Sequence, residues 1–449
     1  MFIERYWKEI KLVYNKIYHI YIIFYSYKCY FCSILVLLHC ERRYSVLQLR
    51  RLPILLMLFA LALSFLYLRK SGLPQISHII AAAAVGLGLL THPYLRWKRG
   101  WKLGVGFVSY AAFVDLVIFA LYGDIHALLS PLYYIFGFII FVYLVNISAN
   151  VGKPFISAVF WIHIAQLLLL TLLSLLGIGK YFGSSRFTGF FNDPNQMGNW
   201  VLWAAIIVSA TGKVIYKSWL PGLLATAIAS VAIVFTASRS ATIGLLVLLG
   251  LYFLLGIIHL LLFIVGLRKV RRIIVSALLV FVLFFSLIIL SGSTFSQEES
   301  IITRVSSQAM YLMVRFEERD LDDTWEGRGY DRLWKFPQYL LFGAGEGATK
   351  RFAEKTRFLG EIHSSWVGVL FNYGLIGSLL FFGFLYVVIH DMKVVWFKLM
   401  LLPPIAYGFA TYNIRNWYFW IGLAVLCICS VSLQHDIDEG KKLCCEKRV

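Results

Sequence analysis

Long apolar blocks separated by short polar breaks run along most of this 449-residue chain. Each block approaches the roughly 20 residues that an α-helix needs to cross the hydrocarbon core of a bilayer. The blocks lack the strict alternation of apolar and polar residues that a transmembrane β-barrel requires. The pattern therefore predicts an all-α polytopic membrane protein of about twelve transmembrane helices, at residues 53–68, 76–91, 103–122, 131–147, 156–178, 195–211, 219–235, 241–265, 273–291, 364–389, 399–412 and 417–433.

One connection, residues 292–363, is far longer than the others and separates nine core spans (53–291) from the last three (364–433). Its pattern predicts helices at Val305–Arg319 and Tyr330–Leu341. A long loop with helical patterns of its own is usually functional, so we expect the active face there.

The N-terminal segment, residues 1–52, fits the pattern less cleanly. Tyr14–Leu38 is apolar enough to span, but its Tyr-rich and Lys-rich beginning suits a helix lying in the membrane interface equally well. It lacks a small-residue cleavage site after a compact apolar core, so it does not read as a signal peptide. We expect an interfacial or appended segment, with a thirteenth span as the alternative.

Composition excludes a soluble enzyme, because 60% of the residues are hydrophobic and only 14% are charged. The net charge of +19 would suggest nucleic acid for a soluble chain, but in a membrane protein Lys and Arg first set the topology. Apart from the long loop, one set of alternate connections carries 21 basic residues and the other carries six. The first set, which includes the 434–449 tail, is therefore predicted to be cytoplasmic. The long loop is predicted to be external, and no nucleic-acid partner is expected.

Two patterns have the spacing of metal sites. Cys29 and Cys32 lack a second pair or a His cluster. The Asp320–Asp323 stretch resembles the Asp-x-Asp pair of some glycosyltransferases, but the long loop holds twelve of the 23 acidic residues, so such a match arises easily by chance. We expect no metal and no other cofactor.

Single arginines stand in two of the predicted external connections. Arg186 lies in a stretch that continues to Asp193-Pro194-Asn195, which predicts a turn followed by a helix start. Arg239 lies in a connection of about five residues between two apolar spans. Snorkelling to lipid headgroups would explain either arginine. A guanidinium at the membrane surface also suits a diphosphate, which it holds through two parallel hydrogen bonds.

His363 lies where the long loop enters the next predicted span. A capping serine, Ser364 or Ser365, and the positive end of the helix dipole disfavour the imidazolium, and a neutral imidazole can act as a general base. The negative charge of the nearby Glu361 would instead favour the imidazolium. Asp115, in mid-span, is expected to face the bundle interior, either in a structural pair or in contact with substrate.

Taken together, these parts resemble the O-antigen ligase and O-antigen polymerase superfamily of bacterial membrane glycosyltransferases, over about residues 180–390. The residues that carry the likeness are Arg186–Asn195, Ser238–Ser240, the run from Gly327 through Trp334 to Gly347, His363–Ser365 and Tyr373–Gly377. Their order, their spacing and their shared predicted side make the set informative.

The resemblance implies a fold similar to that of GT-C glycosyltransferases and a metal-independent glycosyl transfer at the periplasmic face of the inner membrane. A polyprenyl-diphosphate-linked glycan would be the donor and a sugar hydroxyl the acceptor. Mapped onto matching positions, His363 would be the base and Arg186, Arg239 and Arg328 would bind the diphosphate. Further substrate or loop contacts would be Asn195, Arg332 and Glu346, and Arg332 is an alternative to Arg328 as the family's loop arginine.

Polymerase and ligase differ in the acceptor, which is another lipid-linked repeat unit or the lipid A core. The forms Gly327–Arg332 and Gly343–Gly347 look more like those of polysaccharide polymerases, so we favour a polymerase, with a chain-length regulator as a further partner. A transporter or flippase of lipid-linked glycan is the alternative from another class. Transporter sites, however, lie near the bilayer midplane between repeated halves, whereas these polar groups gather on one external face.

Overall fold

A computed structural model describes residues 45–446 except for 71–72, 92–97, 99, 184, 265–300, 318–323 and 357. The chain divides into two units, residues 1–52 and 53–449, and the description below concerns the second. The predicted span 273–291, the segment 1–40 with its cysteine pair, and the Asp320–Asp323 stretch lie outside the described residues.

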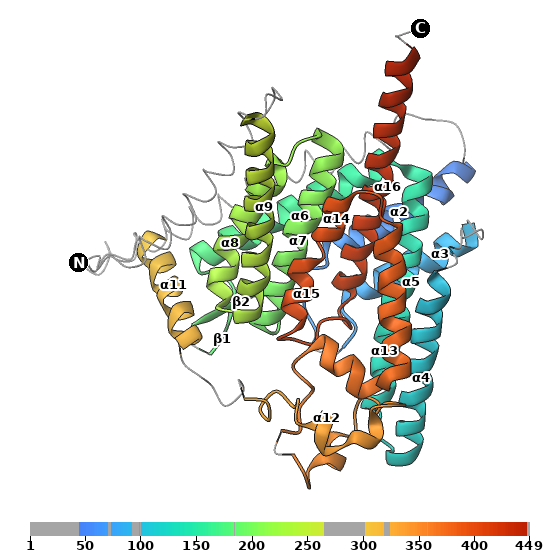
Figure 1. Cartoon of the computed structure of the whole chain (residues 1–449), viewed down its shortest axis with the longest axis vertical. Coiled ribbons are helices and arrows are strands. Elements are labelled where there is room, and N and C mark those ends of the chain that lie inside the picture. The colour runs from blue at the N-terminus through green and yellow to red at the C-terminus, as the bar shows by residue number, and fades with distance from the viewer. Residues whose placement is uncertain are drawn as a thin grey trace, which may run out of the picture. The chain divides into compact units, whose positions relative to one another are not determined.

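Apolar helices make up the second unit. Figure 1 shows the part of the long loop around α12 (Arg332–Lys335) at the end opposite the C-terminus, and α11 (Ile301–Glu317) at the side of the helices. Seven of the described helices are long and apolar enough to cross a membrane, which confirms a polytopic membrane protein. They are α4 (Trp101–Tyr122), α5 (His126–Val151), α6 (Lys153–Leu176), α7 (Pro194–Tyr216), α9 (Arg239–Ile264), α13 (Ser365–Asp391) and α16 (Trp417–Glu446). Shorter apolar helices are α2 (Ser45–Ala62), α3 (Ile76–Thr91), α8 (Leu220–Thr236), α14 (Val395–Leu399) and α15 (Leu402–Gly408).

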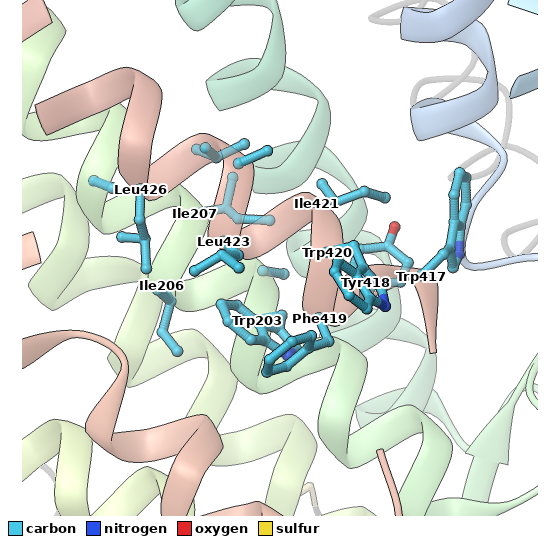
Figure 2. Close-up of a cluster of buried hydrophobic side chains, with 14 of the residues drawn as sticks. Trp203, Ile206, Ile207, Trp417, Tyr418, Phe419, Trp420, Ile421, Leu423 and Leu426 are labelled. Carbon is cyan, nitrogen blue, oxygen red and sulfur yellow. The ribbon is translucent and has the colours of Figure 1, made fainter. Parts of the chain in front are cut away.

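The core is organised around α7, which is buried along nearly its whole length. Figure 2 shows Trp203, Ile206 and Ile207 of α7 against the apolar face of α16. Gly422 of α16 permits this approach, because a Cβ at that position would lie 2.1 Å from the Trp203 ring. Among the seven candidate spans of the described residues α7 is the least apolar and the most enclosed, and its buried polar residues Asn199, Ser209 and Thr211 are thereby kept out of contact with lipid.

One polar cluster joins three helices at the end of the bundle predicted to be cytoplasmic. Asp436 of α16 pairs with Lys153, at the start of α6, at 3.0 Å and with Lys217, just after α7. These residues come from connections that the charge distribution predicts to share one membrane side, and they lie together in the structure.

The one departure from an all-α chain among the described residues is a hairpin of β1 (Lys180–Phe182) and β2 (Arg186–Gly189). It lies between α6 and α7. After it, Asp193 caps α7 by accepting hydrogen bonds from the amides of Asn195 and Gln196, which confirms the predicted turn and helix start.

The described part of the long loop begins with α11 (Ile301–Glu317), close to the predicted helix at 305–319. The second predicted helix is shorter than expected. It is reduced to α12 (Arg332–Lys335) and a 3-10 turn, Pro337–Tyr339, because Pro337 cannot continue an α-helix hydrogen-bond ladder. A further 3-10 turn, Thr349–Phe352, follows. This part of the loop has a small core of its own, formed by Phe336, Ala344, Phe352, Ile362 and Phe371.

The glycine run of the loop docks on a break in α13. Gly374 adopts a φ of 62°, which interrupts the helix and leaves backbone groups open. The amides of Ala344 and Gly345 donate to the carbonyls of Phe371 and Asn372 at 2.9 and 2.7 Å, and the amide of Leu375 donates to the loop at 2.7 Å. The glycines therefore form a backbone interface with α13 and not only a turn.

Candidate functional site

Arg186 of β2 reaches across to the turn between α8 and α9. Its Nε donates to the carbonyl of Thr236 at 3.2 Å, and its Nη2 donates to Asn195 Oδ1 at 3.1 Å. The same oxygen of Asn195 accepts a hydrogen bond from Ser238 Oγ at 2.8 Å. Asn195 thus holds the first predicted arginine beside the turn that carries the second.

Arg239 begins α9 and is joined to Arg315, which the sequence interpretation did not single out. Arg239 Nη1 donates to the carbonyl of Arg315 at 3.1 Å, and Arg315 Nη1 donates to the carbonyl of Ala237 at 2.6 Å. The two arginines are 76 positions apart in the sequence. Their guanidinium groups bond backbone carbonyls at the end of α11 and at the start of α9, and so join these two helix ends.

Arg186, Arg239 and Arg315 form one positively charged group, which we call the arginine cluster. Burial, followed by the charge of Arg315, lowers the pKa of Arg186 to about 10, with a smaller effect of Arg239 in the same direction. At neutral pH the guanidinium is still protonated. Mutual repulsion of this kind, beside the positive N-terminal end of α9, favours the binding of a multiply charged anion.

His363 lies directly before α13 and is half-buried. Its amide donates to the carbonyl of Arg328 at 3.1 Å, and its carbonyl accepts from the Tyr330 hydroxyl at 3.1 Å. Its ring packs 5.1 Å from that of Phe358. Ser364 is the N-cap of α13, as one of the two sequence alternatives predicts. The imidazole therefore lies at the start of a helix on a backbone fixed from two sides.

A segment of residues 407–413, which begins in the last turn of α15, connects His363 with the arginine cluster. Thr411 Oγ1 bonds Ser240 Oγ at 2.9 Å, next to Arg239, while Ser365 Oγ donates to the Thr411 carbonyl at 3.0 Å, two positions after His363. The Tyr407 hydroxyl donates to the Asn195 carbonyl at 2.8 Å. The stretches that carry Arg186, Arg239 and His363 are thus each hydrogen-bonded to this one segment.

Of the remaining predicted residues, Arg328 lies near His363 and Arg332 lies inside the long loop. Arg328 donates to the Ala410 carbonyl at 3.5 Å, so it lies near His363. Arg332 is 2% exposed, and its Nη2 donates to the carbonyls of Phe358 and Gly360 at 2.6 and 2.8 Å. The Arg332 guanidinium therefore shapes the loop from within.

Glu346 lies in a buried polar cluster beneath the loop. Its Oε1 accepts hydrogen bonds from the hydroxyls of Tyr134, Tyr373 and Tyr412 at 2.8 to 2.9 Å. Its amide donates to Asp115 Oδ1 at 2.6 Å. Asp115 thus faces the bundle interior, as expected, and has structural partners there.

Arg415 was missed as a structural residue, although it is a lone arginine in a short predicted external connection, as Arg239 is. Its Nη1 donates to Glu346 Oε2 at 2.7 Å and its Nη2 pairs with Glu361. Burial opposes the charge of Arg415, but the carboxylates of Glu346 and Glu361 raise its pKa well above the usual value. The guanidinium thus ties the loop segment before His363 to the bundle.

Within the described ranges, one group of side chains has the proximity that metal ligands need, formed by His435, Asp436 and Glu439. It lies on α16, at the end opposite the arginine cluster, and Asp436 already pairs with two lysines.

Residues 224–382 match the family model described as O-antigen ligase. The matched stretch contains Arg239, Arg315, Arg328, Glu346 and His363, and it confirms the resemblance stated from the sequence. No curated protein matches the chain.

Proposed function

Because residues 224–382 carry the domain of the O-antigen ligase family, we propose that this multi-pass membrane protein transfers glycan from a polyprenyl-diphosphate donor to a sugar hydroxyl. The observation that carries the proposal is the arginine cluster, in which three guanidinium groups from β2, α9 and α11 gather at one helix start. A diphosphate is the group of the donor that such a cluster suits.

The donor diphosphate binds at the arginine cluster. As the bond from the anomeric carbon to the diphosphate oxygen breaks, negative charge grows on the leaving group, and arginines fixed in advance stabilise it without reorganising. Arginine also forms two parallel hydrogen bonds with phosphate oxygens, which positions the sugar. Asn195 acts as a positioning residue, because it orients Arg186.

His363 takes the proton of the acceptor hydroxyl. The hydroxyl oxygen forms the new bond to the anomeric carbon, its proton moves to a ring nitrogen of His363, and the polyprenyl diphosphate leaves with the electron pair of the broken bond. The Arg328 carbonyl and the Tyr330 hydroxyl hold the His363 backbone, so the ring starts from a fixed position. Arg328 itself is placed to contact phosphate or to shape the loop.

The proposed acceptor is a second lipid-linked repeat unit, which makes the protein a polysaccharide polymerase of the bacterial inner membrane with its active face in the periplasm. Transfer to the lipid A core, the ligase reaction, is the alternative. The glycan profile of a deletion strain separates them. Loss of long chains with one repeat retained indicates the polymerase, and loss of all repeats from the lipid A core indicates the ligase.

The donor site is tested with Arg315→Ala and Arg239→Lys, measured by binding of a polyprenyl-diphosphate analogue to the purified protein. Hydrogen bonds to charged groups contribute about 1.5–3 kcal/mol, so Arg315→Ala should weaken binding by about 10- to 150-fold. Arg239→Lys should also weaken binding, because an ammonium keeps the charge and loses the two-bond geometry.

Arg304→Ala is the matched control on the same helix. Arg304 lies eleven positions before Arg315, on the same face of α11, and donates to the Leu175 carbonyl at the end of α6 at 3.1 Å. Equal effects of the two alanine variants would show that the binding loss comes from undocking α11, and would remove Arg315 from the donor site. Normal analogue binding in Arg315→Ala would do the same.

A further inference from the structure

Two tryptophans of the long loop lie exposed beside each other. Trp325 is 64% exposed and Trp334 is 54% exposed, and their ring centroids are 6.2 Å apart with planes inclined at 62°. The ring of Tyr330 lies 5.6 Å from that of Trp325. We call these three residues the aromatic platform. Adjacent large apolar side chains left in water mark an interaction site more often than single ones do.

The aromatic platform is attached to the backbone of the proposed base. The Tyr330 hydroxyl shares its hydrogen bond between the carbonyls of His363 and Phe409, at 3.1 and 2.7 Å. The platform is thus linked directly to His363, whereas its link to the arginine cluster passes through the segment 407–413. It therefore lies on the His363 side of the site.

We propose that the aromatic platform binds sugar rings of the acceptor glycan, an inference that rests on the proposed function. One face of a pyranose ring is lined by C–H groups and packs against a flat indole, while its hydroxyls remain in water. Tryptophan suits such a ligand because it combines a large apolar surface with a polar N–H. Because Tyr330 of the platform bonds the His363 backbone directly, an acceptor held on the platform would lie beside the base that takes its proton.

Charge argues against the membrane surface as the occupant. Aromatic residues that anchor a segment to a membrane are usually accompanied by Lys and Arg, which are attracted to anionic headgroups. In the sequence, residues 317–335, which include both tryptophans, hold seven acidic and four basic residues. The segment therefore lacks the basic excess that binds anionic headgroups, whereas its net negative charge does not oppose a neutral sugar.

The test measures binding of two soluble oligosaccharides to the purified full-length protein. One is the repeat unit released by mild acid from the strain's own lipid-linked donor, and the other is the lipid A core oligosaccharide. Aromatic contacts contribute about 0.5–1.5 kcal/mol, so Trp325→Ala and Trp334→Ala should each weaken binding of one of these glycans by about 2- to 12-fold. The double variant should weaken it further, and phenylalanine at both positions should retain most of the affinity.

Phe342→Ala is the control, because Phe342 is 61% exposed in the same loop but belongs to the glycine run. It should leave glycan binding unchanged, and all variants should bind the diphosphate analogue normally, which shows that they are folded. Failure of the wild-type protein to bind that analogue would count against the proposed function, not against the platform.

Three results would overturn the platform. The first is equal glycan affinity in the double variant and the wild type, and the second is no binding of either oligosaccharide by the wild type. The third concerns the protein in nanodiscs that contain brominated lipid, which quenches the fluorescence of tryptophans in contact with the bilayer. The proposal is overturned if this quenching is weaker in the double variant while glycan affinity is unchanged. That result would assign the two indoles to the bilayer.

Discussion

Replacing Glu346 with glutamine removes one charge from the most connected side chain of the buried polar cluster. The glutamine carbonyl can still accept hydrogen bonds from tyrosine hydroxyls, but its NH₂ group would face Arg415, where Glu346 Oε2 now accepts at 2.7 Å. Two donors would then point at each other. Glu346→Gln is therefore expected to destabilise the protein mainly through Arg415.

The size of the expected stability loss depends on the partners that Arg415 retains in the variant. Removing one partner of a fully buried ion pair costs about 3–5 kcal/mol. The Arg415 side chain is 20% exposed and retains Glu361, so we expect a smaller loss than for a fully buried pair, about 2–3 kcal/mol. In Glu346→Ala the loss of stability is limited, because the tyrosine hydroxyls retain other partners. Tyr134 can bond Tyr412 at 2.6 Å and Tyr373 can bond Asp115 at 3.0 Å.

The assay is unfolding of the purified protein by SDS titration, combined in a double-mutant cycle with Arg415→Gln. Glu361→Gln is the control, since the Glu361 side chain is 62% exposed and such pairs contribute about 1 kcal/mol or less. Strictly additive losses in Glu346→Gln and Arg415→Gln, or wild-type stability of Glu346→Gln, would refute the reasoning.

Three further outcomes are expected. His363→Ala should lower turnover by about two to four orders of magnitude while donor-analogue binding is retained, as measured by transfer and binding assays on the same preparation, and near-normal turnover would remove the base assignment. Transfer should persist in EDTA, because guanidinium groups compensate the diphosphate charge; if Mn²⁺ were needed to restore it, the 320–323 acidic stretch would become the metal site. Gly374→Ala should lower stability by more than about 1–3 kcal/mol in the same SDS titration, because φ is 62° there and a Cβ would meet the Leu341 carbonyl oxygen at 2.4 Å. The control Gly250→Ala, where a Cβ meets nothing within 4 Å, should be neutral or better.

Seven of the twelve expected membrane helices and two of the three clustered arginines could be predicted from the sequence, whereas the expected span 399–412 is divided between α14, α15 and a stretch that is not helical. Apolar length defines a span regardless of its neighbours, and a lone arginine such as Arg239 is conspicuous between two apolar blocks. Arg315 is different, because it lies on an amphipathic helix. The pattern of α11 predicts a helix with two faces, but Arg304 and Arg315 share one face. Which of them meets α9 depends on how α11 docks.

The buried polar cluster could not be predicted for a related reason. Glu346 stands in a glycine-rich stretch of an acidic loop, and only the docking of that stretch on α13 brings it among three tyrosines from separate segments. Arg415 could have been found, because it follows the same pattern as Arg239. It was weighed only as a positive charge for topology, and its acidic partners are 54 and 69 positions away.

The break in α13 also bears on how the protein is made. At Gly374 the helix leaves backbone groups whose partners are supplied by the loop segment 340–345, and in bare lipid each such group without a partner would cost several kcal/mol. The loop precedes α13 in the chain, so it is synthesised first and can fold as a template on which the broken helix settles. The loop segment and α13 are therefore expected to fold together. A chimera between relatives should exchange the loop together with α13, since a foreign loop would leave backbone groups around Gly374 without their partners.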